Sequence, residues 1–135
     1  MTVVVLDCEQ GSDEWRAARA GIPTASEFGS ILAKGEGKMR RSYMLRLAGE
    51  LITGFPAETY SNAHMERGRE MEAEARDYYA LVSIEPVTRV GFVRDEAKGA
   101  GCSPDSFVGG TGALEIKTAI PSVLIDKIDR GGFPS

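Results

Sequence analysis

The change of sequence pattern at Pro86 constrains the fold of this 135-residue chain more than any other feature. Before Pro86 the pattern is typical of helices, and the longest helix is predicted over 61–82. After Pro86, three β-type segments alternate with glycine-containing turns, over 87–94, 102–108 and 113–118. A last helix is predicted over 121–130. The order helix, three antiparallel-connected strands, helix predicts an α/β core.

The N-terminal half is predicted to be mostly helical. Its expected elements are one short strand and three helices, over 3–7, 12–20, 24–33 and 40–53. The length fits one domain of about 100–150 residues. We therefore expect a single domain, 1–135, with an N-terminal helical part, 1–60, and a core, 61–135. No strand is predicted after the last helix, so the core is expected to lack its final strand or strands.

Composition excludes several classes of protein. The formal net charge of -4 argues against a protein that coats nucleic acid through an overall basic surface. No apolar run approaches the roughly 18 residues of a membrane span, and no secretion signal is present, so the cytoplasm is the expected location, without a membrane partner. Cys8, Cys102 and His64 are too few for a Cys/His zinc site. A bound metal would therefore need oxygen ligands.

One acidic residue falls on the apolar side of the predicted long helix. At about 100° per residue, the apolar and small side chains of this helix share one arc, formed by Met65, Gly68, Met71, Ala75, Tyr79 and Val82. Glu72 lies within that arc, whereas the other acids of the helix project to the opposite side. A buried carboxylate is costly unless it is paired or bound to a metal. Glu72 is thus either a carboxylate with a partner, at the rim of the core, or a metal ligand.

The last predicted strand carries two charged residues on one face. Strict alternation sends Glu115 and Lys117 to the same side of the strand. A three-residue loop at 109–111 would place Asp105 opposite Glu115, whereas a four-residue loop would turn Asp105 to the other face. Two facing carboxylates repel each other unless a positive charge lies between them. A hard divalent cation, Mg²⁺ or Mn²⁺, would relieve that repulsion.

Such a constellation suits phosphodiester hydrolysis. Metal ions can clamp the attacking and leaving oxygens, and Lys117 can orient a water or stabilise negative charge on the phosphorus. The alternative is an ordinary set of surface ion pairs in a small α+β interaction domain.

Several short motifs follow one another along the chain. Pro104-Asp105 and the later Glu115-Ile116-Lys117 match the PD-(D/E)xK pattern of restriction-endonuclease-like nucleases. The surrounding motifs are Gly11-Ser12-Asp13-Glu14-Trp15 with Arg19, Gly21-Ile22-Pro23-Thr24-Ala25-Ser26-Glu27, Gly68-Arg69-Glu70-Met71-Glu72 with Ala75-Arg76, and Cys102-Ser103. In this order and spacing, the chain resembles the phage lambda exonuclease and YqaJ-type viral recombinase family over nearly its whole length.

The resemblance implies a restriction-endonuclease-like fold and roles for individual residues. It implies that Asp105, Glu115 and the backbone carbonyl of Ile116 are metal ligands. It implies that Lys117 is the catalytic lysine and that Glu72 completes the site, as a direct ligand or through water.

Three further residues match a family pocket for the terminal 5′-phosphate of DNA: Arg19, Ser26 and Ser103. An arginine with two hydroxyls is chemically suited to a phosphate dianion. Without the family context, a solvated helix residue, a helix cap and a strand hydroxyl are the alternatives.

The resemblance also implies a function. Members of the family digest linear double-stranded DNA from 5′ to 3′ in phage-type homologous recombination, with Mg²⁺ or Mn²⁺ as cofactor. DNA ends are the implied substrate, a single-strand annealing protein the implied partner, a ring-shaped trimer the family assembly, and the cytoplasm of a bacterial host the implied location. Members continue past the region 131–133, so the chain is expected to represent the N-terminal part of a nuclease domain. The alternative is an impaired remnant that binds DNA ends or a recombination partner without turnover.

A basic cluster offsets the negative net charge locally. Residues 34–46 hold five basic side chains and one acid, a local charge of +4. Lys34, Lys38, Arg40 and Arg41 are the predicted contacts to the DNA backbone. A solvated loop and helix face is the alternative.

Changing Arg40 and Arg41 together to Glu is expected to weaken DNA binding and to flatten its dependence on salt. The reason is that fewer counterions are released when fewer phosphates are neutralised. Binding isotherms over a range of salt concentrations measure both effects. Unchanged binding at low salt would remove the cluster from the DNA interface.

Overall fold

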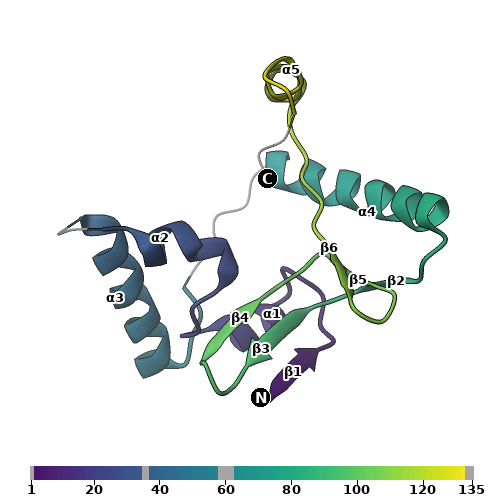
Figure 1. Ribbon diagram of the computed structural model, residues 1–135. Coiled ribbons are helices and arrows are strands. Elements are labelled where there is room, and N and C mark those ends of the chain that lie inside the picture. The colour runs from purple at the N-terminus through teal and green to yellow at the C-terminus, as the bar shows by residue number, and fades with distance from the viewer. Residues whose placement is uncertain (1, 35–36, 58–62, 133–135) are drawn as a thin grey trace.

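The computed structural model describes residues 2–34, 37–57 and 63–132. The helices are α1 (Asp13–Arg19), the 3-10 turn η1 (Ala25–Glu27), α2 (Phe28–Leu32), α3 (Lys38–Thr53), α4 (Ala63–Ser83) and α5 (Pro121–Asp129). The strands are β1 (Val3–Leu6), β2 (Val87–Arg89), β3 (Phe92–Asp95), β4 (Ala100–Cys102), β5 (Ser106–Val108) and β6 (Gly112–Leu114). Figure 1 shows α2 and α3 on one side of the strands and α4 and α5 on the other.

The strands form two antiparallel sheets, in the orders β1-β3-β4 and β2-β5-β6. The β segments predicted over 87–94 and 102–108 are each divided, because the chain passes from one sheet to the other within them. At the first crossing, a Cβ on Gly91 would lie 2.6 Å from Cys8 Sγ, so only glycine lets the backbone approach this closely. The second crossing is the segment 103–105. The three-stranded sheet expected for the core is thus two small sheets, one of which includes β1.

The hairpin of β5 and β6 has a three-residue loop, 109–111. Its Cα partners are Ser106 with Leu114, Phe107 with Ala113, and Val108 with Gly112. One further step of this register puts Asp105 opposite Glu115, which selects the first of the two arrangements left open by the sequence. β6 ends at Leu114, earlier than the predicted strand, because its partner strand begins at Ser106 and leaves the next residues without a ladder.

The buried core is small and centres on Phe92 of β3, which is 0% exposed. Gly101 of β4 lies against its ring, where an added Cβ would come within 2.7 Å of Phe92 Cε2. Val90 and Tyr43 are the other buried hydrophobic residues in the described ranges. The hydroxyl of Tyr43 accepts the backbone N–H of Thr24 at 3.2 Å, which ties α3 to the start of η1.

The long helix buries its predicted apolar arc only in part. α4 lies close to its predicted bounds, but Met65, Tyr79 and Val82 of the expected apolar arc are exposed. The other members of the arc, Gly68, Met71 and Ala75, are partly buried. Arg76, beside the arc, is buried and donates to Ser106 of β5, a contact that the apolar pattern does not encode. Within the described ranges, no helix combines the length and apolar character of a membrane span.

Replacing Gly101 with Ala is expected to lower the free energy of unfolding by about 1–3 kcal/mol, the usual cost of overpacking a core. Gly110→Ala is the matched control, because a Cβ there meets nothing within 4 Å, and its effect is expected to stay within about 0.5 kcal/mol. Denaturant titrations of both variants measure the difference. Equal unfolding midpoints would contradict the close contact at Phe92.

Candidate active site

The crossing segment Ser103–Asp105 is anchored by side chains from the N-terminal part of the chain. Trp15 of α1 donates from Nε1 to Ser103 Oγ at 2.9 Å. Gln10 donates from Nε2 to the Pro104 carbonyl at 2.9 Å. The same amide donates to a backbone carbonyl of the other crossing at 2.7 Å. These bonds fix the backbone that leads into Asp105.

Asp105 is held at both its backbone and its carboxylate. Its carbonyl accepts from Ser106 Oγ at 2.6 Å and from Arg76 Nη2 at 3.5 Å. Its Oδ2 accepts the backbone N–H of Ile116 at 2.5 Å. The two parts of the Asp and Glu-Ile-Lys pattern, separated along the sequence, therefore meet across the end of the hairpin.

Glu115 and Lys117 form an ion pair with each other. Both are exposed, whereas Leu114 and Ile116 line a hollow of about 300 Å³ against α4, so the predicted alternation of faces is observed. The hydrogen bond that Lys117 donates to Glu115 raises the pKa of Lys117; desolvation opposes the rise, and the charges of Glu115 and Asp105 add to it. Lys117 is thus a protonated ammonium at neutral pH, within the field of both acids.

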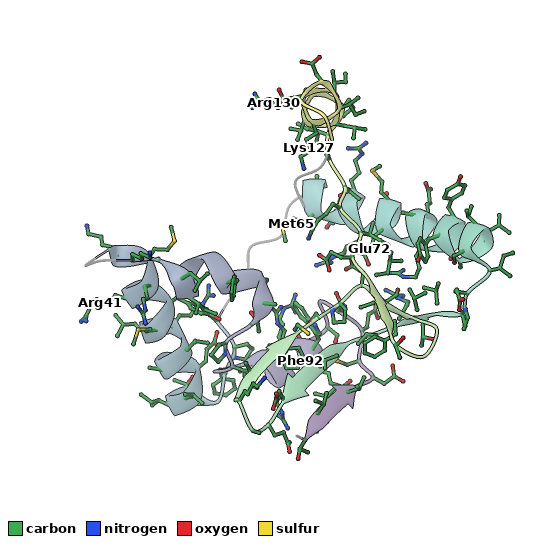
Figure 2. All side chains as sticks on the ribbon, in the orientation of Figure 1. Arg41, Met65, Glu72, Phe92, Lys127 and Arg130 are labelled. Atoms are coloured by element: carbon green, nitrogen blue, oxygen red, sulfur yellow. The ribbon has the colours of Figure 1, made fainter. Side chains whose placement is uncertain are left out.

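Glu72 points from α4 toward the strands (Figure 2). Its Oε1 accepts from Arg76 Nη2 at 2.5 Å, one helical turn away. Glu72 and Asp105 both line a cavity of about 540 Å³. Arg76 is therefore the partner that an acid on this side of the helix requires, and Glu72 faces the same space as Asp105.

The donors predicted for a metal are all oxygens, and this chemistry suits the hard cations Mg²⁺ and Mn²⁺. Asp105 lies opposite Glu115, and the bonded backbone of Ile116 is beside both. In the described part of the chain, however, no three acidic, histidine or cysteine side chains gather into one metal-binding group. Glu72 is engaged by Arg76 and Glu115 by Lys117, so the three predicted carboxylates do not converge as a single cluster.

A second polar cluster lies where α1 faces the turn η1. Arg19 Nη2 donates to Ser26 Oγ at 3.2 Å and to Thr24 Oγ1 at 3.5 Å, and these two hydroxyls are 3.1 Å apart. The Arg19 guanidinium also stacks on the Trp15 ring, 3.9 Å from its centroid. Arg19 and Ser26 are therefore in direct contact, and Ser103 joins them through the indole N–H.

Arg19 keeps unused donor capacity. Its Nε is buried and has no hydrogen-bond partner among the residues that the structure describes. Burial lowers the pKa of Arg19 from an ordinary value so high that the guanidinium still carries its charge at neutral pH. A charged guanidinium beside two hydroxyls is a chemically suitable phosphate-binding group.

Trp15 connects the two clusters. It lines the hollow of about 140 Å³ beside Arg19 and also the larger cavity that Glu72 and Asp105 share. The cluster of Arg19, Thr24 and Ser26 and the cavity lined by Glu72 and Asp105 therefore border the same indole.

The four predicted DNA-backbone residues are all exposed: Lys34, Lys38, Arg40 and Arg41. Lys34 precedes α3, and the other three lie in its first turn, which carries no acid. Cations at a helix N-terminus oppose the helix dipole, so helix stability does not account for them. In Figure 2, Arg41 lies at the outer side of α3, away from the strands.

Gln10 and Arg76 are among the residues of this site that were given no role from the sequence. The spacing of Glu72 and Arg76 is a recognisable signal, because residues four apart on a helix can pair. Gln10 has no local signal, since its partners are 80 and 94 residues away.

The chain is similar to known proteins both in sequence and in fold. The family model of the YqaJ-like viral recombinase domain matches residues 14–134. The fold is similar to that of an alkaline exonuclease, LHK-Exo, from Laribacter hongkongensis, with 38% identity and a TM-score of 0.75. The structure of LHK-Exo in complex with dAMP matches with 39% identity and a TM-score of 0.76. No curated protein sequence matches.

The likeness to LHK-Exo confirms the expected α/β fold of the exonuclease type. Each match covers 89% of this chain and 60% of LHK-Exo. The chain therefore spans about 60% of the length of the exonuclease that it matches.

Replacing Arg19 with Ala is expected to shift the fluorescence emission of Trp15, the only tryptophan, to longer wavelength, because the ring loses its cation and gains contact with water. Arg16→Ala is the control on the same helix, since Arg16 pairs with Asp13 at 3.0 Å. Emission spectra of the three proteins measure the effect. An Arg19→Ala spectrum that matches the parent would contradict the stacking.

Proposed function

Because the chain belongs to the YqaJ-like viral recombinase domain family, we propose that it is a metal-dependent exodeoxyribonuclease of phage-type recombination. Its substrate is linear double-stranded DNA, digested from 5′ to 3′. The likeness to an alkaline exonuclease supports this class of reaction. Activity of the 135-residue chain itself belongs to the proposal, since the chain spans about 60% of that exonuclease.

One contact carries the proposal, the hydrogen bond from the Ile116 N–H to Asp105 Oδ2. It holds the aspartate that precedes β5 against the middle residue of the Glu-x-Lys segment that follows β6. Lys117 is close enough for the charge of Asp105 to help raise its pKa. Two carboxylates, a backbone carbonyl and an ammonium at one point suit the hydrolysis of a phosphodiester.

The residues that would hold Mg²⁺ or Mn²⁺ are Asp105, Glu115 and the carbonyl of Ile116, with Glu72 acting directly or through water. When bound, such an ion polarises the phosphoryl oxygens and lowers the pKa of a coordinated water. Lys117 would orient the attacking water and offset negative charge at the phosphorus.

Arg19, Ser26 and Ser103 would bind the terminal 5′-phosphate. The support is the bond from Arg19 to Ser26, the free Nε of Arg19, and the link to Ser103 through Trp15. Because Trp15 also borders the cavity lined by Glu72 and Asp105, a bound 5′ end would lie beside these two acids. This arrangement favours cleavage that starts at a 5′ end.

The LHK-Exo structure that contains dAMP offers further support, because a mononucleotide is the kind of product that an exonuclease releases. The cavity beside Glu72 and Asp105, about 540 Å³, falls in the common range of about 300–1,000 Å³ for small-molecule sites. The cavity would therefore be large enough for a released mononucleotide.

The exposed cations Lys34, Lys38, Arg40 and Arg41 would follow the backbone of the duplex. The remaining 3′ tail would pass to a single-strand annealing protein in the cytoplasm of the bacterial host.

A second candidate is a protein that binds DNA ends without cleaving them. One observation favours it: Glu115 pairs with Lys117 and Glu72 with Arg76, so two of the three predicted carboxylate ligands already have a cationic side chain as partner.

The proposal predicts Mg²⁺-dependent loss of linear, 5′-phosphorylated duplex DNA. Asp105→Ala is expected to abolish it, and Lys117→Ala to slow it about 100-fold or more, as for removal of one preorganised charge at the reacting group. Lys98→Ala is the matched control, because Lys98 pairs with Asp95 in a distant exposed turn. Strand-specific end labels in a gel assay measure both rate and polarity.

The outcomes separate the candidates. Binding of DNA ends by the parent chain without cleavage would select the second candidate. Cleavage that persists in Asp105→Ala would exclude the proposed site.

A further inference from the structure

Arg76 is a buried arginine, 8% exposed, at the point where α4 meets the second sheet. Its Nε donates to Ser106 Oγ at 2.8 Å. Its Nη2 donates to Glu72 Oε1 at 2.5 Å and lies 3.5 Å from the carbonyl oxygen of Asp105. One guanidinium therefore contacts the proposed acid of the helix and the backbone of the proposed acid of the strand.

Ser106 extends this contact. It is 0% exposed, and its hydroxyl accepts from Arg76 while donating to the Asp105 carbonyl at 2.6 Å. Ser106 donates its one hydroxyl proton to the backbone carbonyl of Asp105. The carboxylate of the same Asp105 accepts the N–H of Ile116. The Asp105 peptide is thus held directly and through Ser106 by the same side chain.

We propose that Arg76, with Ser106 as its relay, is the positioning residue that keeps Glu72 and Asp105 in one geometry for a shared divalent cation. This inference rests on the proposed nuclease function. Arg76 acts through the two acids and touches no reacting atom, so its role is to set the distance and orientation between them.

The chemistry of the guanidinium explains why the position holds arginine. A planar fork can donate along several directions at once, here to a hydroxyl, a carboxylate and a backbone carbonyl. Lysine at this position would keep the charge but could not reproduce that pattern. Stability alone is a weaker explanation, since buried ion pairs are often replaced by apolar residues without loss of stability.

Charge and geometry have opposite effects on a cation, which determines the choice of variants. The positive charge of Arg76 repels a divalent ion, whereas the geometry that it imposes on Glu72 and Asp105 favours binding. Arg76→Lys and Ser106→Ala both leave the net charge unchanged. A loss of affinity in either variant therefore reports positioning alone.

The test is Mn²⁺ binding by calorimetry in the absence of DNA, together with Mg²⁺-dependent cleavage. Arg76→Lys is expected to weaken Mn²⁺ binding about 10- to 100-fold, the usual effect of losing a residue that orients metal ligands. Ser106→Ala is expected to change affinity in the same direction by a smaller factor. Both variants should lower kcat while leaving the KM for DNA unchanged. A loss of folded protein would instead lower the stoichiometry of Mn²⁺ binding without changing its affinity.

Arg130→Lys is the matched control, because Arg130 pairs with Asp126 at the same helical spacing on exposed α5. Circular dichroism establishes folding, and if Arg76→Lys does not fold, Ser106→Ala decides the question. Folded variants that bind Mn²⁺ within twofold of the parent would overturn the positioning role. A parent that binds Mn²⁺ without cleaving would overturn the nuclease proposal alone, and a parent that does neither would overturn both.

Discussion

The crossing segment Ser103–Asp105 is the constraint on which the rest of the site depends. Two small sheets exchange the chain here, so its backbone groups lack strand partners and need other ones. Gln10 supplies one of them by donating to the Pro104 carbonyl, and Trp15 holds the segment through the side-chain hydroxyl of Ser103. The bond of Trp15 also links this segment to α1, the helix that contains Arg19. The position of Asp105 and that of the cluster of Arg19, Thr24 and Ser26 are thus coupled through a few contacts.

Charge in this protein is balanced locally. Within the net charge of -4, several acids are paired with a nearby cation, as in the ion pairs of Glu72 with Arg76 and of Glu115 with Lys117. An exposed pair such as Glu115 with Lys117 contributes little to stability. In the proposed reaction, these pairs would hold the charges in place beforehand and so lower the reorganisation that catalysis requires.

Much of the site follows from the sequence, and its limits are physical. Alternation correctly placed Glu115 and Lys117 on one face, since side chains of an extended chain point alternately to the two sides. The apolar arc of the long helix was only partly correct as a guide to burial: Met71 and Ala75 are partly buried, whereas Tyr79 and Val82 are exposed. Periodicity describes which residues share a face, but it does not say how much of that face a small sheet can cover.

The sequence by itself determined the order of most elements and the alternation that places Glu115 and Lys117 on one face. These are local properties, set by residue type and spacing. Only the tertiary structure decided the loop length that puts Asp105 opposite Glu115, the division of the strands between two sheets, and the convergence of Gln10, Trp15 and Arg76 on one segment. Such contacts join residues far apart in the chain, so no short stretch of sequence records them.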